Sequence, residues 1–173
     1  MKIRFLNSQN ATAYRQLRLQ ALSESVTAFA SSFEQEDRLT LTDFITRLNA
    51  HDNYNSGIFG AFDDKERLRG MLGFSRESRP KRAHVGSLWS MYVLPEFRRQ
   101  GLGSALLDSA LSHARQLGVV RQIILTVTAN NSAASSFYKS RGFERFGFER
   151  NALFIDGTYF DEEHLVLYFN HDI

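Results

Sequence analysis

Residues 91–104 read Met91-Tyr92-Val93-Leu94-Pro95-Glu96-Phe97-Arg98-Arg99-Gln100-Gly101-Leu102-Gly103-Ser104. They join a predicted strand, Val85 to Leu94, to an amphipathic pattern that predicts a helix from Leu102. The two glycines permit positive φ and a close approach of the backbone to a ligand, and the start of a helix favours an anion. The two arginines offer the forked donors that phosphate oxygens prefer. The stretch therefore predicts an anion-binding turn, although a Gly-x-Gly pattern taken alone is equally typical of an ordinary turn.

The segment that follows predicts a parallel strand, helix and strand unit. Apolar residues recur every three or four positions from Leu102 to Leu117, and Gly118 is placed to end this helix. The next run, Ile123-Ile124-Leu125-Thr126-Val127, is continuous, which is typical of a strand covered on both faces. This order predicts two parallel strands joined by a right-handed crossover.

The rest of the chain contains no repeat, low-complexity tract or Gly/Ser linker. We therefore expect a single domain over residues 1–173. Hydrophobic patterning predicts helices at 10–22, 42–50 and 132–141, and strands at 2–6, 57–62, 68–75, 143–150 and 163–169, the last two on either side of a turn at Asp156-Gly157.

Composition narrows the class of protein. The 173 residues are 43% hydrophobic with two prolines, which predicts one compact core. No apolar run approaches the roughly 18 residues of a membrane span, and the first residues lack the apolar core of a signal peptide. We therefore expect a cytoplasmic protein without membrane contact. The net charge is +2, and the sequence has no basic run interleaved with aromatic residues. We therefore expect no nucleic-acid partner.

The chain has no cysteine, which excludes disulfides, thiolate metal sites and an acyl intermediate on an enzyme thiol. His51, His164 and His171 show no spacing typical of metal ligands. We therefore expect no metal site, and any chemistry must use other side chains.

A second motif allows a more specific interpretation of residues 91–104. Leu125-Thr126-Val127-Thr128-Ala129-Asn130-Asn131-Ser132-Ala133-Ala134-Ser135-Ser136-Phe137-Tyr138 and then Gly142-Phe143, together with 91–104, resemble the GNAT family of acyl-CoA-dependent N-acyltransferases. The resemblance is dense from about 85 to 169 and weaker upstream. It implies an α/β fold with a mixed, twisted, largely antiparallel sheet of about seven strands, a splayed parallel pair and about four helices. Acyl-CoA would lie in the gap between the splayed strands.

The resemblance also implies where acetyl-CoA, the expected co-substrate, would bind. Main-chain amides of Arg98, Arg99, Gln100, Gly101, Leu102, Gly103 and Ser104 would hold its pyrophosphate. The backbone of Met91 and Val93 would pair with the pantetheine arm, while their side chains pack in the core. An amide near Tyr92 would polarise the thioester carbonyl. Asn131 would contact the cofactor. The alternative for Asn131 is the N-cap of the helix that follows, and the two roles are compatible because Asn130 could be the cap instead.

The resemblance assigns Tyr138 the role of general acid near the thioester sulfur. A phenol with a pKa of about 10 can protonate a departing thiolate of similar basicity. The alternative is a partly buried aromatic residue whose hydroxyl bonds to a neighbour. The implied reaction is direct transfer of an acetyl group to a primary amine within a ternary complex.

The general base is open, because Thr126 occupies a position where many members of the family have glutamate. Glu34, Glu36 and His84 are candidates, each with a solvated or surface role as the alternative. We favour a water chain that draws on backbone carbonyls. Trp89 is expected in the core, and the acidic run Asp161-Glu162-Glu163 with Tyr159 either borders the acceptor pocket or forms a solvated turn.

Two other readings stay open. One is a non-catalytic acyl-CoA-binding or sensing module with the same fold. The other, a nucleotide site of the P-loop type, is disfavoured because the turn lacks Gly-Lys-Ser/Thr. The expected partner is a small-molecule or peptide amine, and the chain is expected to be a monomer or a homodimer.

Overall fold

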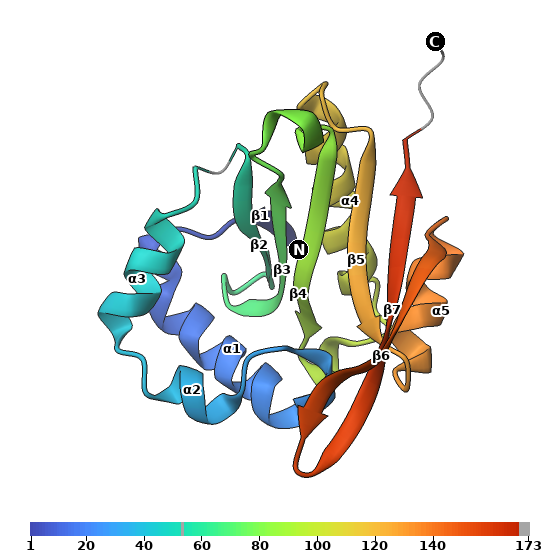
Figure 1. The fold of residues 1–173 in the computed structure, drawn as a ribbon. Coiled ribbons are helices and arrows are strands. Elements are labelled where there is room, and N and C mark those ends of the chain that lie inside the picture. The colour runs from blue at the N-terminus through green and yellow to red at the C-terminus, as the bar shows by residue number, and fades with distance from the viewer. Residues whose placement is uncertain (53, 170–173) are drawn as a thin grey trace.

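A computed structural model describes residues 1–52 and 54–169, so His171 lies outside the described residues. They form one seven-stranded sheet in the order β1-β2-β3-β4-β5-β7-β6, drawn in Figure 1. Its strands are β1 (Lys2–Phe5), β2 (Ser56–Phe62), β3 (Leu68–Arg76), β4 (Val85–Val93), β5 (Gln122–Thr128), β6 (Glu144–Ile155) and β7 (Thr158–Tyr168). The helices are α1 (Ala11–Glu24), α2 (Phe33–Asp37), α3 (Leu41–Asn49), α4 (Leu102–Gln116) and α5 (Ser132–Ser140).

The strands β4 and β5 are parallel and separate along their length. They pair only where Val85 to Ser87 faces Gln122 to Ile124, whereas β4 continues to Val93 and β5 to Thr128. The other neighbouring strands of the sheet pair antiparallel. The mixed sheet with a splayed parallel pair that the motif implied is therefore confirmed.

A bulge in β4 lies where this strand leaves β5. The register with β3 shifts between Met71 and Gly73, and Ser90 has a φ of +54°. A bulge bends its strand and increases the local twist. The irregularity is thus located at the mouth of the gap between the two parallel strands.

Two apolar clusters cover the two faces of the sheet. Helix α4 packs on one face, where Leu106, Leu107 and Ala110 meet Phe74 and Ile123. On the other face, α1 and α3 bury residues such as Tyr14 and Phe44 against Met71 of β3. In Figure 1, α1 to α3 lie together on one side of the sheet, while α4 runs behind it. None of the described helices is long and apolar enough to cross a membrane.

The predicted elements correspond to observed ones, with two differences. The last two strands are longer than expected and form one hairpin around a turn in which Asp156 and Gly157 both have positive φ, as a type I′ turn requires. The short helix α2 was not predicted. Its start carries a capping box between Ser32 and Gln35, a sequence signal that could have located it.

Candidate active site

The gap between β4 and β5 opens into a cleft of about 440 Å³. Both strands, the turn before α4 and the start of α5 contribute to its wall. Its lining includes the site residues Met91, Tyr92, Val93, Arg98, Gly103, Asn131 and Tyr138. The structure therefore brings together residues from all three segments of the predicted donor site.

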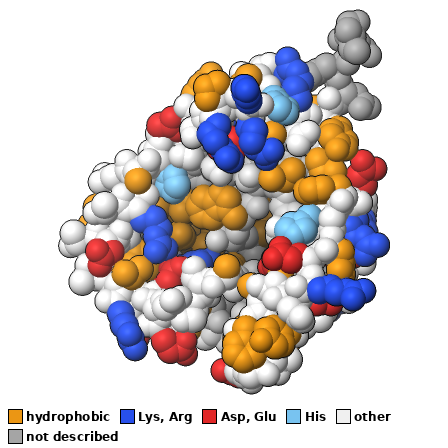
Figure 2. All heavy atoms as spheres, in the orientation of Figure 1, with side chains coloured by type: hydrophobic (Ala, Val, Ile, Leu, Met, Phe, Trp, Pro, Cys, Tyr) orange, Lys and Arg blue, Asp and Glu red, His pale blue; other side chains and the backbone are white. Residues whose placement is uncertain are grey.

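A second cavity of about 410 Å³ adjoins the first. Trp89, Ser90, Leu125 and Thr126 line both cavities, so the two meet where the strands separate. Figure 2 shows a hollow on this face, with hydrophobic side chains at its floor and acidic and histidine side chains at its rim. A donor on one side of the splay and an acceptor on the other could therefore meet between the strands.

The turn before α4 has the geometry of an anion site. Gly101 is the N-cap residue with a φ of +86°, and α4 begins without a side-chain cap. The amide of Ala105 donates to the carbonyl oxygen of Gly101, which closes the first turn, so the amides before it have no acceptor within the helix. A Cβ atom at Gly101 would meet no atom within 4 Å. The backbone here is open to a ligand and offers unpaired donors.

Side chains of the turn differ in what they can do. Arg98 donates to the carbonyl oxygen of Val93 at 2.9 Å, and its guanidinium lies 5.5 Å from the Tyr92 ring centroid. Gln100 donates to the carbonyl oxygen of Glu96 at 2.7 Å.

Leu102 packs its side chain in the core, so only its amide can reach a ligand. Arg99 is exposed, and Ser104 is half-buried on α4.

In β4, Met91 and Val93 are half-buried and pack against the α4 side of the core. The Tyr92 side chain is buried on the opposite side, and its hydroxyl donates to Glu24. Burial, followed by the hydrogen bond to Glu24 and its charge, raises the Tyr92 pKa. Its side chain is therefore structural, and a contribution to chemistry must come from the main chain.

Tyr138 is 6% exposed, and its ring makes edge contacts with Phe137 and Phe143. Burial alone raises the pKa of its phenol. The residue also lines the cleft, so it is both a core residue and a protonated group at the site of the splay. The two interpretations of Tyr138 are thus compatible.

Asn131, not Asn130, is the N-cap of α5. Its Oδ1 atom accepts a hydrogen bond from the Ala134 amide at 3.1 Å. Of the two caps that the sequence allowed, Asn131 is therefore confirmed and Asn130 is not the cap, because the helix begins at Ser132. Asn131 also lines the cleft, so the capping residue itself faces the predicted ligand.

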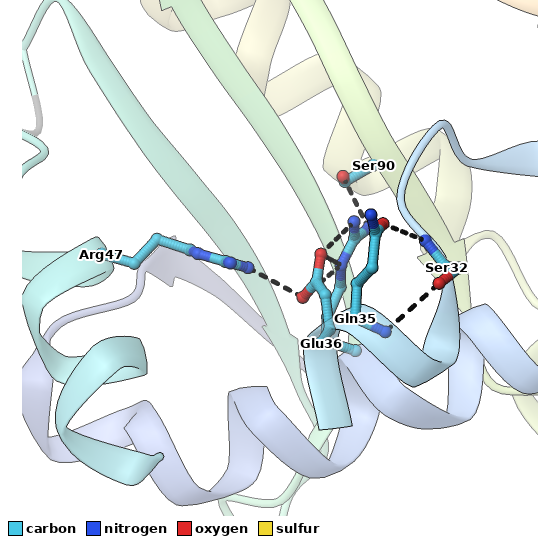
Figure 3. A network of polar contacts seen from close by, with 6 residues as sticks. Ser32, Gln35, Glu36, Arg47 and Ser90 are labelled. Atoms are coloured by element: carbon cyan, nitrogen blue, oxygen red, sulfur yellow. Dashed lines mark hydrogen bonds and ion pairs between the residues drawn. The ribbon is translucent and has the colours of Figure 1, made fainter. Parts of the chain in front are cut away.

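Among the predicted bases, Glu36 forms ion pairs instead. Its carboxylate lies 2.8 Å from Arg18 and 2.9 Å from Arg47, and its side chain is almost fully buried. Burial by itself would raise the Glu36 pKa, but hydrogen bonds and charge from the two arginines outweigh it and lower the pKa. Figure 3 shows Arg47 reaching Glu36 from α3, and the network extends to Ser90 through Arg18 at 2.9 Å. Glu36 is a structural anion that braces the bulge in β4.

The other two candidate bases lie elsewhere. Glu34 is exposed on α2, and neither cavity includes it in its described lining. His84 directly precedes β4, at the paired end of the parallel strands, where its carbonyl oxygen accepts from the amides of Arg121 and Gln122. Neither residue is placed to take a proton inside the splay.

The acceptor side keeps part of what was expected. Trp89 is half-buried and lines both cavities, with the His51 ring 5.9 Å away. Glu162 lines the second cavity, and burial raises its pKa, with smaller effects from His164 and Glu149. Glu163 instead accepts from Ser135 on the α5 side, and Tyr159 is exposed. Of the acidic run, Glu162 is therefore the residue that lines the second cavity.

The sequence did not predict a line of three hydrogen-bonded side chains that begins at the second cavity. The Thr126 hydroxyl lies 3.3 Å from His164 Nδ1, and His164 Nε2 lies 3.2 Å from the Glu149 carboxylate. Alternation along 162–168 could have placed 162 and 164 on one face, but the pairing with Thr126 required the register of β5 and β7. No group of residues suited to a metal ion occurs within the described part of the chain.

Comparison with known proteins agrees with this geometry. Residues 19–143 match the model of the Acetyltransferase (GNAT) family, which confirms the resemblance of the motifs. A mycothiol acetyltransferase from Salinispora arenicola is 30% identical over 125 residues, covering 72% of this chain and 40% of that protein. The ribosomal protein bS18 alanine N-acetyltransferase of Escherichia coli is 38% identical over 65 residues, covering 38% of this chain and 43% of that protein. The chain thus spans less than half the length of these curated relatives.

Solved structures share the whole fold. An acetyltransferase of the GNAT family from Streptococcus pneumoniae superposes with a TM-score of 0.83 at 24% identity, over 97% of this chain and 99% of that one. A putative acetyltransferase from Salmonella typhimurium, solved with its cofactor acetyl-CoA, gives 0.84 at 18% identity, over 100% and 96%. A phosphinothricin acetyltransferase from Sinorhizobium meliloti, in complex with acetyl-CoA, gives 0.82 at 18% identity, over 96% and 87%.

Proposed function

Because the chain belongs to the GNAT acetyltransferase family, whose co-substrate is acetyl-CoA, we propose that it transfers an acetyl group from acetyl-CoA to a primary amine. The observation that carries this proposal is the cleft between β4 and β5 beside the uncapped start of α4. Free amides at a helix start suit a pyrophosphate, and the gap between separated strands suits an extended amide-containing arm. The residues present therefore fit the co-substrate.

In the proposed complex, the main chain of 98–104 holds the pyrophosphate, and the backbone of Met91 and Val93 pairs with the pantetheine arm. The hydrogen bond from Arg98 to the Val93 carbonyl occupies one acceptor of that edge. Binding of the arm would exchange this contact, which frees the guanidinium for a phosphate oxygen. The amide near Tyr92 polarises the thioester carbonyl, and Asn131 contacts the ligand beside the start of α5.

Tyr138 is the proposed general acid. Its side chain reaches the cleft, and its raised pKa keeps the phenol protonated at neutral pH. It can therefore give its proton to the departing thiolate. The absence of cysteine from the chain supports direct attack of the amine in a ternary complex.

The second cavity is the proposed acceptor site. Phe29, Trp89 and Phe146 supply aromatic walls, and Glu162 supplies a carboxylate. Aromatic faces and a carboxylate both favour a cation, and alkyl amines are cationic at neutral pH. The acceptor class is therefore a small-molecule or peptide amine.

The proposal is tested by titrating acetyl-CoA calorimetrically and then measuring free CoA thiol with a panel of amines. A suitable panel contains spermidine, L-lysine, phosphinothricin and a peptide that begins with alanine. Acetyl-CoA should bind, and CoA release should depend on the amine. Binding without release for any amine would favour the non-catalytic acyl-CoA-binding module, and failure to bind acetyl-CoA would contradict both readings.

A further inference from the structure

Glu149, His164 and Thr126 form a line across three adjacent strands. Thr126 of β5 is the register partner of His164 in β7, and Glu149 comes from the neighbouring β6. The two contacts of the imidazole, 3.3 Å to Thr126 Oγ1 and 3.2 Å to a Glu149 oxygen, use its two different nitrogens. The line therefore runs from the edge strand β6 to the gap between β4 and β5.

The position of each member suits transport of a proton from the acceptor. His164 lines the second cavity, whereas Thr126 lines both cavities. An amine in the second cavity that attacks a thioester in the first must pass the place where these cavities meet. Thr126 is thus the member closest to the reacting nitrogen, and His164 lies directly behind it.

The contacts also fix which nitrogen can accept a proton. An ionised carboxylate only accepts, so Nε2 donates to Glu149, and the lone pair of Nδ1 is left toward the Thr126 hydroxyl. A hydroxyl both donates and accepts. Thr126 can therefore take a proton from the amine while it gives its own proton to Nδ1.

Gly147 gives the imidazole its place beside β6. It is the register partner of His164, and a Cβ atom at this glycine would lie 3.3 Å from both Cβ and Cδ2 of His164. Such a contact is tighter than most Cβ contacts in proteins, so with a side chain here the ring would have to shift slightly. The bare backbone at 147 lets the ring sit between its two hydrogen-bond partners.

We propose that His164, held by Glu149 and linked to the substrate by the Thr126 hydroxyl, is the proton acceptor for the attacking amine. This inference rests on the proposed acetyl transfer. The cationic amine first loses one proton to solvent, which gives its nitrogen a lone pair. As the C–N bond forms and the C–S bond breaks, a second amine proton passes to Thr126 Oγ1 and the hydroxyl proton passes to His164 Nδ1. Tyr138 protonates the thiolate, and one proton returned through solvent restores both the imidazole and the phenol.

The charges around the imidazole are compatible with this role. Glu149 contacts the ring, and Glu162 lies two residues away on the wall of the same cavity. Arg18 also lines that cavity, but its charge is paired with Glu36. Among the described residues facing the ring, a carboxylate is therefore the closest charge, and it stabilises the imidazolium formed in turnover.

The test compares His164→Gln with His84→Gln, since His84 is an exposed histidine outside both cavities. Using the amine that gives the fastest CoA release, His164→Gln should lower kcat by about 10²- to 10⁴-fold. The acetyl-CoA Kd should stay within about twofold, because the residue lies outside the donor cleft. The rising limb that a histidine base gives to the kcat/KM profile should be lost in His164→Gln and kept in His84→Gln.

Glu149 is a positioning residue, and its test uses the pH profile. Glu149→Gln should lower kcat by about tenfold and move the rising limb to lower pH, because the neutral amide no longer favours the protonated ring. Glu144→Gln, an exposed change on the same strand, should do neither. An unshifted limb in Glu149→Gln would contradict the positioning role.

At Thr126 the hydroxyl can be removed with almost no change in the shape of the side chain. Thr126→Val removes the hydroxyl and should lower kcat, whereas Thr126→Ser should restore turnover that the valine variant loses. This pair keeps the test decisive if His164→Gln does not fold. Equal turnover and pH profile in wild type and His164→Gln, or in Thr126→Val and Thr126→Ser, would overturn the inference while leaving acetyl transfer intact. Failure of the wild type to release CoA with any amine would overturn both.

Discussion

Arg98 donates a hydrogen bond from Nε to the carbonyl oxygen of Val93 at 2.9 Å, which ties the turn before α4 to the end of β4. The same guanidinium lies over the Tyr92 ring and 3.7 Å from Glu24 of α1. The proposed phosphate site and the proposed pantetheine edge are therefore joined by one side chain. A ligand bound at one of these places should therefore change the hydrogen bonding at the other.

Replacing Arg98 should weaken binding of acetyl-CoA. Arg98→Gln removes a charge-assisted donor, so the Kd should rise by about 10- to 100-fold at low ionic strength. The difference should shrink in high salt, because exposed charges are screened. Calorimetric titration of acetyl-CoA measures both effects. Arg82→Gln, an exposed arginine paired with Glu77, is the matched control, and an unchanged Kd in Arg98→Gln would remove Arg98 from the donor site.

Gly101 can be tested against Gly118, since both have positive φ and neither has an atom within 4 Å of an added Cβ. Alanine at either position should cost stability of about 1–2 kcal/mol through backbone strain. Only Gly101→Ala should also raise the acetyl-CoA Kd, by about tenfold, because it lies at the open helix start and Gly118 follows the far end of α4. Equal changes in Kd for the two variants would show that strain, and not proximity to the ligand, is the cause.

Tyr138→Phe should separate catalysis from stability. Turnover should fall by about 10²- to 10⁴-fold, as for loss of a general acid. Acetyl-CoA affinity should be nearly unchanged, and the free energy of unfolding should move by less than about 0.5 kcal/mol, since ring packing with Phe137 and Phe143 is retained. Tyr159→Phe, at an exposed position, is the control. Wild-type turnover in Tyr138→Phe would reject the acid role.

Glu36 should matter for stability. Glu36→Gln leaves the buried Arg18 without its charged partner and should cost about 3–5 kcal/mol, whereas the exposed Glu34→Gln should stay within about 0.5 kcal/mol. Because the Glu36 pKa is lowered in the folded state, its contribution is fully present above the unfolded pKa of about 4.5 and is lost as pH falls through the folded pKa. Urea unfolding at pH 7 and between pH 5 and 3 measures this. A Glu36→Gln variant as stable as Glu34→Gln would contradict the bracing role.

Local patterns predicted the central part of the fold. The turn at Gly101, the helix ending before Gly118 and the parallel strand at 123–127 depend on periodicity and on glycine conformation, which are properties of neighbouring residues. The seven-residue spacing placed Asn131 and Tyr138 on one face of a helix, and the family resemblance implied that this face lies near the cofactor. The sequence left the cap open between Asn130 and Asn131, because two adjacent asparagines have the same capping chemistry.

Pairings between distant segments could not be predicted in this way. Glu36 was a candidate base until the structure showed that residues 18 and 47, on two other helices, neutralise it. His164 faces Thr126 because of the register of β5 with β7, and a shift of one residue would turn the ring to the other face of the sheet. The alternation along 162–168 indicates the face on which residue 164 lies, but it does not identify the residue of β5 that lies opposite.

Mass spectrometry of both products tests the central claim most directly. Acetyl-CoA is incubated with the protein and the responding amine, and acetylated amine and free CoA are quantified together. Transfer predicts one acetylated amine for each CoA released, and almost no release without the amine. CoA release without an equal amount of acetylated amine, or no release with any amine despite acetyl-CoA binding, would contradict the proposed acetyl transfer.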